Sequence, residues 1–542
     1  MGAPGVTARD IEASYRLSSR LQSRLRDVEV RAPGDPRRSV LAMSEPQHDT
    51  AHPGTAQPEE PAQQLGTGSA PTDTAALDFT YDVIVIGAGP VGENAADRAG
   101  RGGLKVAIVE QRLVGGECSF WACIPSKALL RPIHAHHAAH RVRGVDGARI
   151  DVEELLARRD YWVSDLDDSG ATGWLDSSGI DLIRGHGRLA GERVVDVDGQ
   201  QYHARVAVVL ATGTAASVPP IPGLREAAPW TNIEATTSKT VPGRLVVLGG
   251  GVVAAEMAQV YGALGSTVTV IERGERLLAR TEAFAGEMVA GALRNEGVDV
   301  RLGVSAERVE RPTAGGEVTV HLSDGTSVSA EEVLAALGRT PSSADLGLDT
   351  VGVGTTEPGY VEVDDKLEVT AAPGRWLYAV GDITGRNLLT HMGKYQGRVC
   401  GDVIAARAAG EPDDGPGMTA WADALGAPQV VFTDPEVAAV GLTEQAARDK
   451  GLTVRAVHVE MSSVSGAGLL ADGYTGKAQL VVDESTRTVV GATFVGQDVA
   501  ELLHSATIAV VGKVPLEQLW HAVPSFPTLS EVWLRLLESY GL

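Results

Sequence analysis

The chain has 542 residues, of which 43% are apolar and 22% charged, and its formal net charge is -23. This length exceeds a single ordinary core and predicts several domains, and the composition is that of a globular protein. The acidic balance would repel phosphate backbones and anionic lipid, and Lys and Arg form no basic stripe along the sequence. We therefore expect neither nucleic acid nor a membrane as a partner.

The sequence also argues against export and membrane insertion. Residues 206–224 lack charge but contain three prolines and two glycines, which predicts a short strand, a turn and a linker. The N-terminus is charged from Arg9 onward and lacks the apolar core of a secretory signal. Only three cysteines occur, two of them five positions apart, which favours reactive chemistry in a reducing compartment. These features predict a cytoplasmic protein.

Residues 1–79 are rich in Ala, Pro, Gly, Ser, Gln and charged residues. This composition predicts a mostly disordered N-terminal tail. A short amphipathic helix over residues 11–28 fits the pattern, and Met43 offers a second start. The sequence leaves open whether the residues before Met43 are natural or functional.

A dinucleotide-binding pattern follows the tail. The apolar run 83–86 predicts a buried strand, and Gly87, Gly89 and Gly92 follow it in the spacing G-x-G-x-x-G. These glycines permit a tight turn, the approach of a pyrophosphate and close helix–strand packing, in that order. The next helix N-terminus would stabilise the phosphates, and Glu110, which closes the following strand, would accept hydrogen bonds from a ribose.

A second copy of this pattern begins at residues 245–248. Gly249, Gly251 and Ala254 stand in the three turn positions, and Glu272 closes the next strand. Alanine is an accepted variant in the third position. The internal repeat predicts two nucleotide-binding folds and therefore two bound nucleotides.

The acid of the second unit bears on the coenzyme. Glu272 favours a free ribose 2′-hydroxyl and hence NADH, whereas Arg273 and Arg276 could receive a 2′-phosphate. NADH is our prediction, with NADPH as the open alternative. The simpler alternative for both acids, Glu110 and Glu272, is a solvated strand end.

The pattern changes again from about residue 427. Strand-like runs cover 430–432, 478–482 and 489–495, and a helical stretch follows over 499–511. This order of elements predicts a separate α+β domain at the end of the chain.

Cys118 and Cys123 follow the first nucleotide unit closely. In an ideal helix, residues five apart would lie about 7.5 Å apart along the axis and point to different sides. A bridge between them therefore requires a distorted turn, and a strained, accessible bridge is the reducible kind. A helix N-terminus and Lys127 would favour the thiolate. Cys400 has no second cysteine near it in the sequence and is predicted to be a buried free thiol.

The run Gly-Gly-x-Cys-x-x-x-x-Cys-Ile-Pro-Ser-Lys, with two dinucleotide turns, resembles the class I pyridine nucleotide-disulfide oxidoreductases. This is the family of dihydrolipoamide dehydrogenase, glutathione reductase and mercuric reductase. Similar motifs span nearly everything after Tyr81, namely Ala211-Thr212-Gly213, Leu337-Gly338-Arg339-Thr340-Pro341, Tyr378-Ala379-Val380-Gly381-Asp382, Asp434-Pro435-Glu436-Val437 and Val440-Gly441-Leu442-Thr443.

The resemblance implies an α/β fold with two Rossmann-like dinucleotide-binding domains and a C-terminal α+β dimerisation domain. FAD is expected in the first unit, NAD(P)H in the second, and a homodimer through the last domain. The expected segments are 80–225 and 351–425 for FAD, 226–350 for NAD(P)H and 426–542 for dimerisation.

The resemblance also implies roles for single residues. Cys123 is expected against the isoalloxazine, and Cys118 is expected to meet the substrate. Lys127 and Glu256 match the family's ion pair near flavin N5, where it would stabilise developing charge. Asp382 is expected at the ribityl or phosphate region of the flavin. The other cofactor-binding positions that the motifs imply are Ala211, Thr212, Gly213, Gly338 and Gly381.

One position departs from the family pattern. Dithiol-type members carry a histidine of the partner subunit as acid and base, in a His-Pro-Thr segment near the C-terminus, but Phe526 stands there in this chain. Phenylalanine moves no proton, so a rate contribution of about 10² to 10⁴ should be lost. His521 could substitute only if Pro524 redirects the chain, and what replaces the histidine stays open.

The residues between the cysteines depart as well. Phe120 and Trp121 could exclude a large lipoyl arm or offer a flat surface to an aromatic acceptor, or they could simply pack against the flavin domain. Mercury is disfavoured as a substrate because further metal-gathering cysteines near the chain ends are absent. We predict no metal site.

The predicted function is an FAD-dependent NAD(P)H oxidoreductase that passes electrons through Cys118 and Cys123 to a disulfide or another small acceptor. One alternative is an NAD(P)H quinone reductase in which the flavin reduces the acceptor directly. A second alternative is a nucleotide-binding redox partner without turnover of its own, which the missing histidine would suit.

Overall fold

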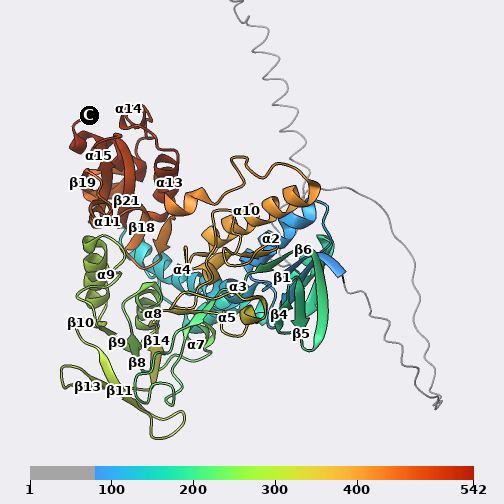
Figure 1. Cartoon of the computed structure of the whole chain (residues 1–542). Coiled ribbons are helices and arrows are strands. Elements are labelled where there is room, and N and C mark those ends of the chain that lie inside the picture. The colour runs from blue at the N-terminus through green and yellow to red at the C-terminus, as the bar shows by residue number, and fades with distance from the viewer. Residues whose placement is uncertain (1–79) are drawn as a thin grey trace, which may run out of the picture. The chain divides into compact units, whose positions relative to one another are not determined.

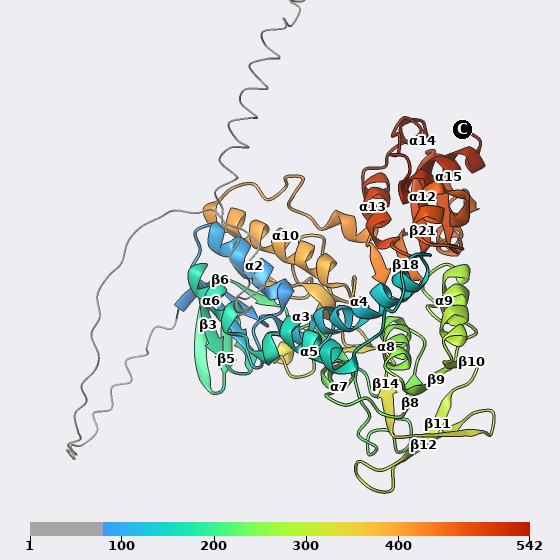
Figure 2. The ribbon, with the colours of Figure 1, turned by 180° about the vertical axis from the view of Figure 1, so that it is seen from behind.

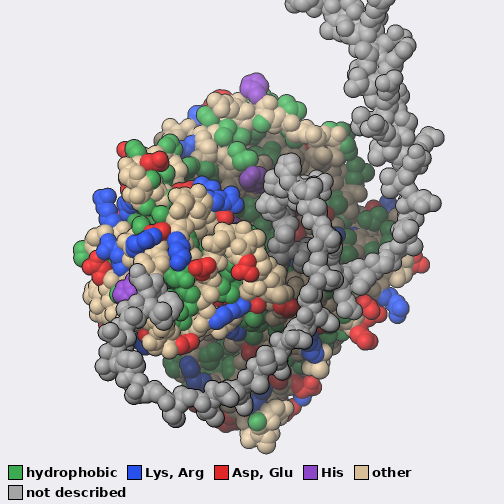
Figure 3. All heavy atoms as spheres, turned by 90° about the vertical axis from the view of Figure 1, so that its right-hand side faces the viewer, with side chains coloured by type: hydrophobic (Ala, Val, Ile, Leu, Met, Phe, Trp, Pro, Cys, Tyr) green, Lys and Arg blue, Asp and Glu red, His purple; other side chains and the backbone are tan. Residues whose placement is uncertain are grey.

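The computed structural model describes residues 80–542 (Figures 1 and 2). The tail predicted for residues 1–79, including the helix over 11–28, lies outside the described residues. Within the described range, no helix has the length and apolar character needed to cross a bilayer. On the face shown in Figure 3, basic and acidic side chains are intermixed wherever described residues are visible.

The first sheet has the order β3-β2-β1-β6-β5-β4, with β16 beside β6. Residues 83–86 form the end of β1 and are at most 3% exposed, because helices and further chain cover both faces. The strands are β1 (Thr80–Ile86), β2 (Val106–Glu110), β3 (Ile180–Arg184), β4 (Gly187–Gly191), β5 (Val194–Val197), β6 (Gln200–Leu210) and β16 (Leu377–Ala379).

The parallel strands of this sheet end together. Ile86 of β1 pairs with Val109 of β2 and with Leu210 of β6, and Leu210 pairs in turn with Ala379 of β16. Ligands of open parallel sheets bind outside these carboxyl ends. The register therefore brings the ends of four strands to one edge, where the glycine turn also lies.

Helices α2 (Pro90–Arg101) and α10 (Thr390–Ala409) lie side by side along this sheet (Figures 1 and 2). Three glycines of α10 face α2. A Cβ at Gly393 would lie 2.5 Å from a Val91 methyl carbon, and one at Gly397 would lie 2.6 Å from the Val91 carbonyl oxygen. A Cβ at Gly401 would lie 2.6 Å from Cβ of Arg98. Only glycine permits this close approach of the two helices.

The remaining α-helices of this part lie between β2 and β3 in the sequence. They are α3 (Gly116–Phe120), α4 (Cys123–His140), α5 (Val152–Trp162) and α6 (Ser169–Ser177).

The second nucleotide unit has a four-stranded parallel sheet in the order β10-β9-β8-β14 and a three-stranded antiparallel sheet in the order β11-β12-β13. Its elements are α7 (Asn232–Thr237), β8 (Arg244–Leu248), α8 (Val252–Ala263), β9 (Thr267–Glu272), α9 (Ala283–Asn295), β10 (Asp299–Leu302), β11 (Ala306–Glu310), β12 (Val318–Leu322), β13 (Ser327–Ala330) and β14 (Glu332–Ala335). Strands β7 (Thr214–Ala216) and β15 (Arg339–Pro341) pair where the chain enters and leaves this unit.

The last part is a five-stranded antiparallel sheet, β17-β18-β21-β20-β19, packed with helices. The predicted α+β character is confirmed. Its elements are β17 (Gln429–Val431), β18 (Glu436–Gly441), α11 (Glu444–Asp449), β19 (Val454–Glu460), α12 (Ser465–Leu470), β20 (Lys477–Asp483), β21 (Thr488–Gly496), α13 (Leu503–Val511), α14 (Leu516–Leu519) and α15 (Val532–Tyr540).

The glycine turn makes a testable prediction about stability. A Cβ at Gly92 would lie 1.9 Å from the Gly87 carbonyl oxygen, so the backbone of Gly92→Ala must shift. We expect this variant to lose about 1–3 kcal/mol of unfolding free energy. Gly100→Ala, on the same helix with its nearest contact at 3.9 Å, should be neutral or stabilising by up to about 1 kcal/mol. Urea unfolding followed by tryptophan fluorescence measures both, and equal losses would contradict the packing role.

Candidate active site

The two predicted glycine turns lie at the carboxyl ends of the parallel strands and leave room for a ligand. A Cβ at Gly89 would meet nothing nearer than 3.9 Å, and one at Gly251 nothing within 4 Å. Helices α2 and α8 start directly after these residues, and neither has a side chain capping its first turn. Uncapped amides next to open space suit a pyrophosphate. Both turns therefore fit a dinucleotide.

The two predicted acids also lie at these turns. Glu110 accepts hydrogen bonds from the amides of Ala88 (2.9 Å) and Arg112 (2.7 Å). Glu272 accepts one from Gly274 N (2.6 Å), and its Cγ would lie 2.7 Å from a Cβ at Gly250. Each carboxylate is thus held over its own glycine turn.

The other predicted cofactor positions gather at the same strand ends. Residues 211–213 follow β6, and the turn of Gly381 and Asp382 follows β16, the strand next to β6. Asp382 accepts a hydrogen bond from the Thr214 hydroxyl (2.8 Å), and burial raises the pKa of its carboxyl. In the second unit, a Cβ at Gly249 would lie 2.3 Å from Ala336 O, two residues before Gly338. Ala254 is buried in α8.

The helix breaks between the two cysteines. Helix α3 ends at Phe120, and α4 begins at Cys123. Between them, Trp121 has φ -137° and ψ 4°, and Ala122 has φ -138° and ψ -94°. This is the distorted turn that the spacing predicts. The break also makes Cys123 the first residue of an 18-residue helix, where the helix dipole favours a thiolate.

Both sulfurs contact the same hydroxyl group. Thr390 Oγ1 lies 3.1 Å from Cys118 Sγ and 3.5 Å from Cys123 Sγ. The thiol of Cys118 donates to Cys123, which lowers the pKa of Cys123 to about 6 and, together with burial, raises the pKa of Cys118. Thr390 and the charge of Lys127 lower the pKa of Cys123 further, against the effect of burial. The reduced pair therefore carries its thiolate on Cys123 and its proton on Cys118.

Lys127 and the buried Glu256 form an ion pair beside this helix start. Lys127 Nζ lies 3.0 and 2.7 Å from the two carboxylate oxygens of Glu256, which is 3% exposed. The same carboxylate accepts a hydrogen bond from Phe432 N (2.9 Å), and Lys127 Nζ lies 4.9 Å from the Phe432 ring centroid. The loop before β18 thus completes the surroundings of the pair.

A second ion pair at the site was not predicted. Arg339 donates to both carboxylate oxygens of Glu117, at 2.8 and 2.7 Å, and Glu117 directly precedes Cys118. Asn232 Nδ2 donates to Glu117 (2.7 Å) and to the Trp121 carbonyl (2.8 Å). Arg339 lies in the family motif Leu337–Pro341, so the sequence singled out this residue but did not indicate its role. No sequence signal pointed to Asn232 or Thr390.

The aromatic residues between the cysteines are packed and offer no open face. Phe120 is 2% and Trp121 7% exposed, in a cluster with Val163. The sequence left open whether these rings exclude a large substrate, offer a flat surface to an acceptor or pack against the flavin domain. Their burial matches packing. By contrast, Phe526 is 75% exposed, and His521 is exposed as well.

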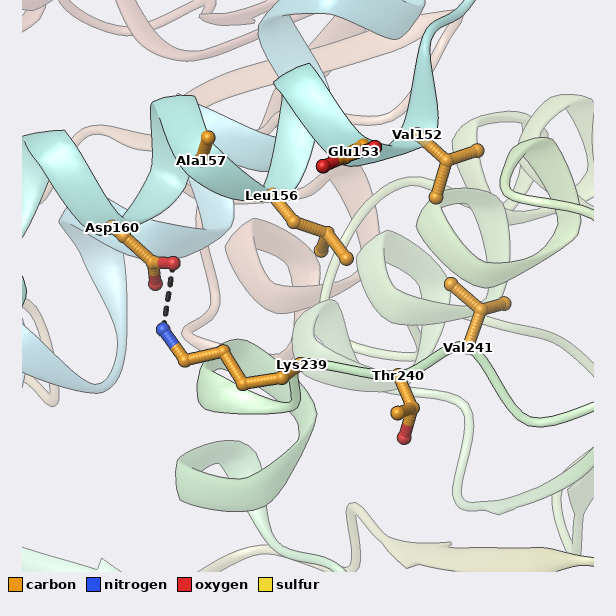
Figure 4. Close-up of a pocket in the computed structure, with 8 residues that line it drawn as sticks. All are labelled: Val152, Glu153, Leu156, Ala157, Asp160, Lys239, Thr240 and Val241. Carbon is orange, nitrogen blue, oxygen red and sulfur yellow. Dashed lines mark ion pairs between the residues drawn. The ribbon is translucent and has the colours of Figure 1, made fainter.

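Two further features lie apart from the cysteines. Cys400 is fully buried, as predicted. A surface pocket of about 600 Å³ lies between α5 and residues 239–241. Asp160 and Lys239, which line it, form an ion pair at 2.6 Å, drawn as a dashed line in Figure 4. Among residues 80–542, no group of three or more His, Cys, Asp or Glu side chains is arranged to hold a metal ion.

The chain has two dinucleotide turns, a cysteine pair at a helix start and a lysine–carboxylate pair beside that pair. These features define a dithiol oxidoreductase that uses two nucleotides. Residues 81–401 match the family model "Pyridine nucleotide-disulphide oxidoreductase", and residues 427–536 match the dimerisation domain of that family. The chain belongs to the pyridine nucleotide-disulphide oxidoreductase family. It is an FAD-dependent oxidoreductase with a nicotinamide coenzyme.

Curated relatives are similar over most of their length. A dihydrolipoyl dehydrogenase of Thermus scotoductus is 36% identical over 85% of this chain and 97% of its own length. A mercuric reductase of Staphylococcus aureus is 31% identical over 84% of this chain and 81% of its own length. Among solved structures, the HOCl-induced flavoprotein disulfide reductase RclA from Escherichia coli has a TM-score of 0.72 and 26% identity, covering 84% of this chain and 99% of that one.

The contact of Thr390 with both sulfurs leads to a prediction about the ionisation of Cys123. Burial raises the pKa of Cys400, and the pKa of Cys118 is raised too, so Cys123 is the one cysteine that ionises near neutral pH. We expect thiolate absorbance of the reduced protein to rise with pH around a midpoint of about 6. Thr390→Val removes a donor to the thiolate and should raise this midpoint by about one pH unit.

Thr390→Ser keeps the hydroxyl and is the matched control, expected to titrate like the parent protein. An unchanged midpoint in Thr390→Val would contradict the assignment of Thr390 as a thiolate donor.

Proposed function

We propose that the protein carries electrons from NADH through FAD to the Cys118–Cys123 pair, and from Cys118 to a small disulfide or another small acceptor. The observation that carries this proposal is the contact of both sulfurs with one hydroxyl, next to the Lys127–Glu256 pair. The names of the relatives support it, since they include a dihydrolipoyl dehydrogenase and a flavoprotein disulfide reductase.

Residues 80–225 and 351–425 would hold FAD, with Gly87, Gly89 and Gly92 at the pyrophosphate. Glu110 would bind the adenosine ribose, and Asp382 the ribityl or phosphate region. Residues 226–350 would hold the nicotinamide coenzyme. The uncapped helix starts and the open space at both turns support these assignments.

Bound FAD would take up a hydride and release two electrons to the disulfide. The residues of this chain prepare that transfer. Lys127, held in place by Glu256, would put a positive charge near flavin N5, where negative charge would develop during the transfer. Reduction would leave Cys123 as the thiolate, stabilised by the start of α4, and would put a proton on Cys118, which would attack the acceptor once it has lost that proton.

A quinone reductase in which the cysteines are accessory is the rival function, and one variant separates the two. Cys118→Ser removes the sulfur that meets the acceptor, so turnover with small disulfides should fall to background, while FAD stays bound. Steady-state NADH oxidation with a disulfide and with a quinone measures both activities. Two results together would contradict the relay through the cysteines: Cys118→Ser reduces a quinone at the parental rate, and the parent protein reduces no disulfide.

We propose NADH as the preferred coenzyme because Glu272 lies over the second glycine turn, where it would accept a hydrogen bond from a ribose 2′-hydroxyl. Arg276 donates to the carbonyls of Ala279 (2.9 Å) and Thr281 (3.4 Å), which leaves its guanidinium engaged. We expect kcat/KM for NADH to exceed that for NADPH at least about tenfold. A preference for NADPH would contradict this assignment.

We propose a homodimer through residues 426–542, in keeping with the matched dimerisation domain. Val523 (86%) and Phe526 (75%) are exposed apolar residues of this part, and a second copy would cover them. Phe526 of the partner subunit would then stand where dithiol-type members carry their acid–base histidine. A cytoplasmic location stays a prediction from composition.

Phe526→His tests this arrangement. A histidine in that place would supply the missing acid and base, so disulfide turnover should rise at least about tenfold, with a new ionisation in its pH profile. Phe526→Leu is the control and should gain nothing. An equal rate in both variants would contradict the placement of Phe526 at the partner's cysteine site.

A further inference from the structure

Glu117 and Arg339 form an ion pair that lies next to the redox cysteines and has no role in the function proposed above. Their side chains are 24% and 27% exposed, and the two hydrogen bonds between them, at 2.8 and 2.7 Å, form a bidentate contact. A bidentate contact fixes geometry as well as charge. Glu117 lies in α3 beside Cys118, so this contact anchors the shorter of the two cysteine-bearing helices.

Both connections between the nucleotide units meet at this carboxylate. Arg339 lies in β15, on the returning connection, and it also donates to Thr214 of β7 through Nε (2.9 Å) and Nη2 (2.7 Å). Asn232 begins α7, at the end of the outgoing connection, and it is 6% exposed. Glu117 therefore receives hydrogen bonds from both connections, and α3 is held by the second unit as well as by the first.

Arg339 and Cys123 interact through their charges. Hydrogen bonds and charge from Glu117, together with the charges of Asp382 and Cys123, raise the pKa of Arg339 against the effect of burial. The interaction is mutual, so a guanidinium without a counter-charge would favour the Cys123 thiolate. The other groups that face Cys123 are Cys118 of α3, Thr390 of α10, Lys127 of α4 and Glu256 of α8.

We propose that Glu117 is a positioning residue that neutralises Arg339 beside the cysteine pair, keeps the Cys123 thiolate from further stabilisation, and so makes the reduced pair a stronger electron donor. The inference rests on the proposed function and deepens it. Reduction breaks the S–S bond and takes up two electrons from the nicotinamide coenzyme, by way of FAD, and one proton. It leaves a thiol on Cys118 and a thiolate on Cys123. A more stable thiolate is a weaker nucleophile and a weaker reductant.

The test is the thiolate titration of the reduced holoprotein. Glu117→Gln keeps the size of the side chain but leaves Arg339 without this counter-charge, so the Cys123 midpoint should fall by at least about half a pH unit. Loss of a purely structural anchor would act in the other direction, because a loosened α3 weakens the hydrogen bonds from Cys118 and Thr390 to Cys123. The sign of the shift therefore separates the two roles.

Three further variants serve as controls. Glu117→Asp keeps the charge and should keep the parental midpoint, and the double variant Glu117→Gln/Arg339→Gln removes both charges and should return toward it. Asp402→Asn breaks a comparable bidentate pair with Arg98 (2.6 and 2.8 Å). Asp402 lies twelve residues along α10 from Thr390, about 18 Å along the axis, and should leave the midpoint unchanged.

An unchanged or raised midpoint in Glu117→Gln overturns the inference, even where disulfide turnover persists. If Glu117→Gln fails to fold, the double variant decides in its place: a midpoint well below the parental value would overturn the neutralising role. A lowered midpoint in Glu117→Gln, in a protein that reduces no disulfide, supports the inference while contradicting the proposed function.

Discussion

Two residues that leave helical geometry, Trp121 and Ala122, determine the rest of the active site. In one continuous helix, Cys118 and Cys123 would point to different sides. The break brings both sulfurs to the hydroxyl of Thr390 and gives Cys123 the first position of α4. The local backbone thus sets where the two sulfurs lie, and the side chains around them lower the pKa of Cys123 and raise that of Cys118. The Trp121 carbonyl, left free by the break, is satisfied by Asn232 (2.8 Å).

The last domain contributes to the chemistry within its own chain. Phe432 N completes the hydrogen bonds of Glu256, and Gln259 of α8 donates to the Asp434 carbonyl (3.1 Å) and accepts from the Asp434 amide (2.7 Å). His137 of α4 holds the Asp434 carboxylate at 2.8 Å. One loop is therefore fastened to α4 and α8, the helices that carry Lys127 and Glu256.

The sequence predicted the parts of this structure that depend on local spacing. Buried strands, glycine turns and closing acids recur at fixed intervals, so the fold class and the two nucleotide units could be predicted. The distorted turn followed from the five-residue spacing of Cys118 and Cys123. Contacts between distant segments could not be predicted, because Thr390 is 272 residues from Cys118, and Arg339 is 222 residues from Glu117. For Phe120 and Trp121, burial decided between alternatives that residue type left open.

The glycine contacts between α2 and α10 link the position of an active-site residue, Thr390, to residues further along α10. Thr390 is the first residue of α10, and Gly393, Gly397 and Gly401 set how closely that helix approaches α2. A larger residue at any of these three positions would push α10 outward and carry the hydroxyl away from both sulfurs. Substitution along this helix is therefore constrained at every fourth position over a little more than two turns, and the constraint comes from the position of the Thr390 hydroxyl as much as from packing.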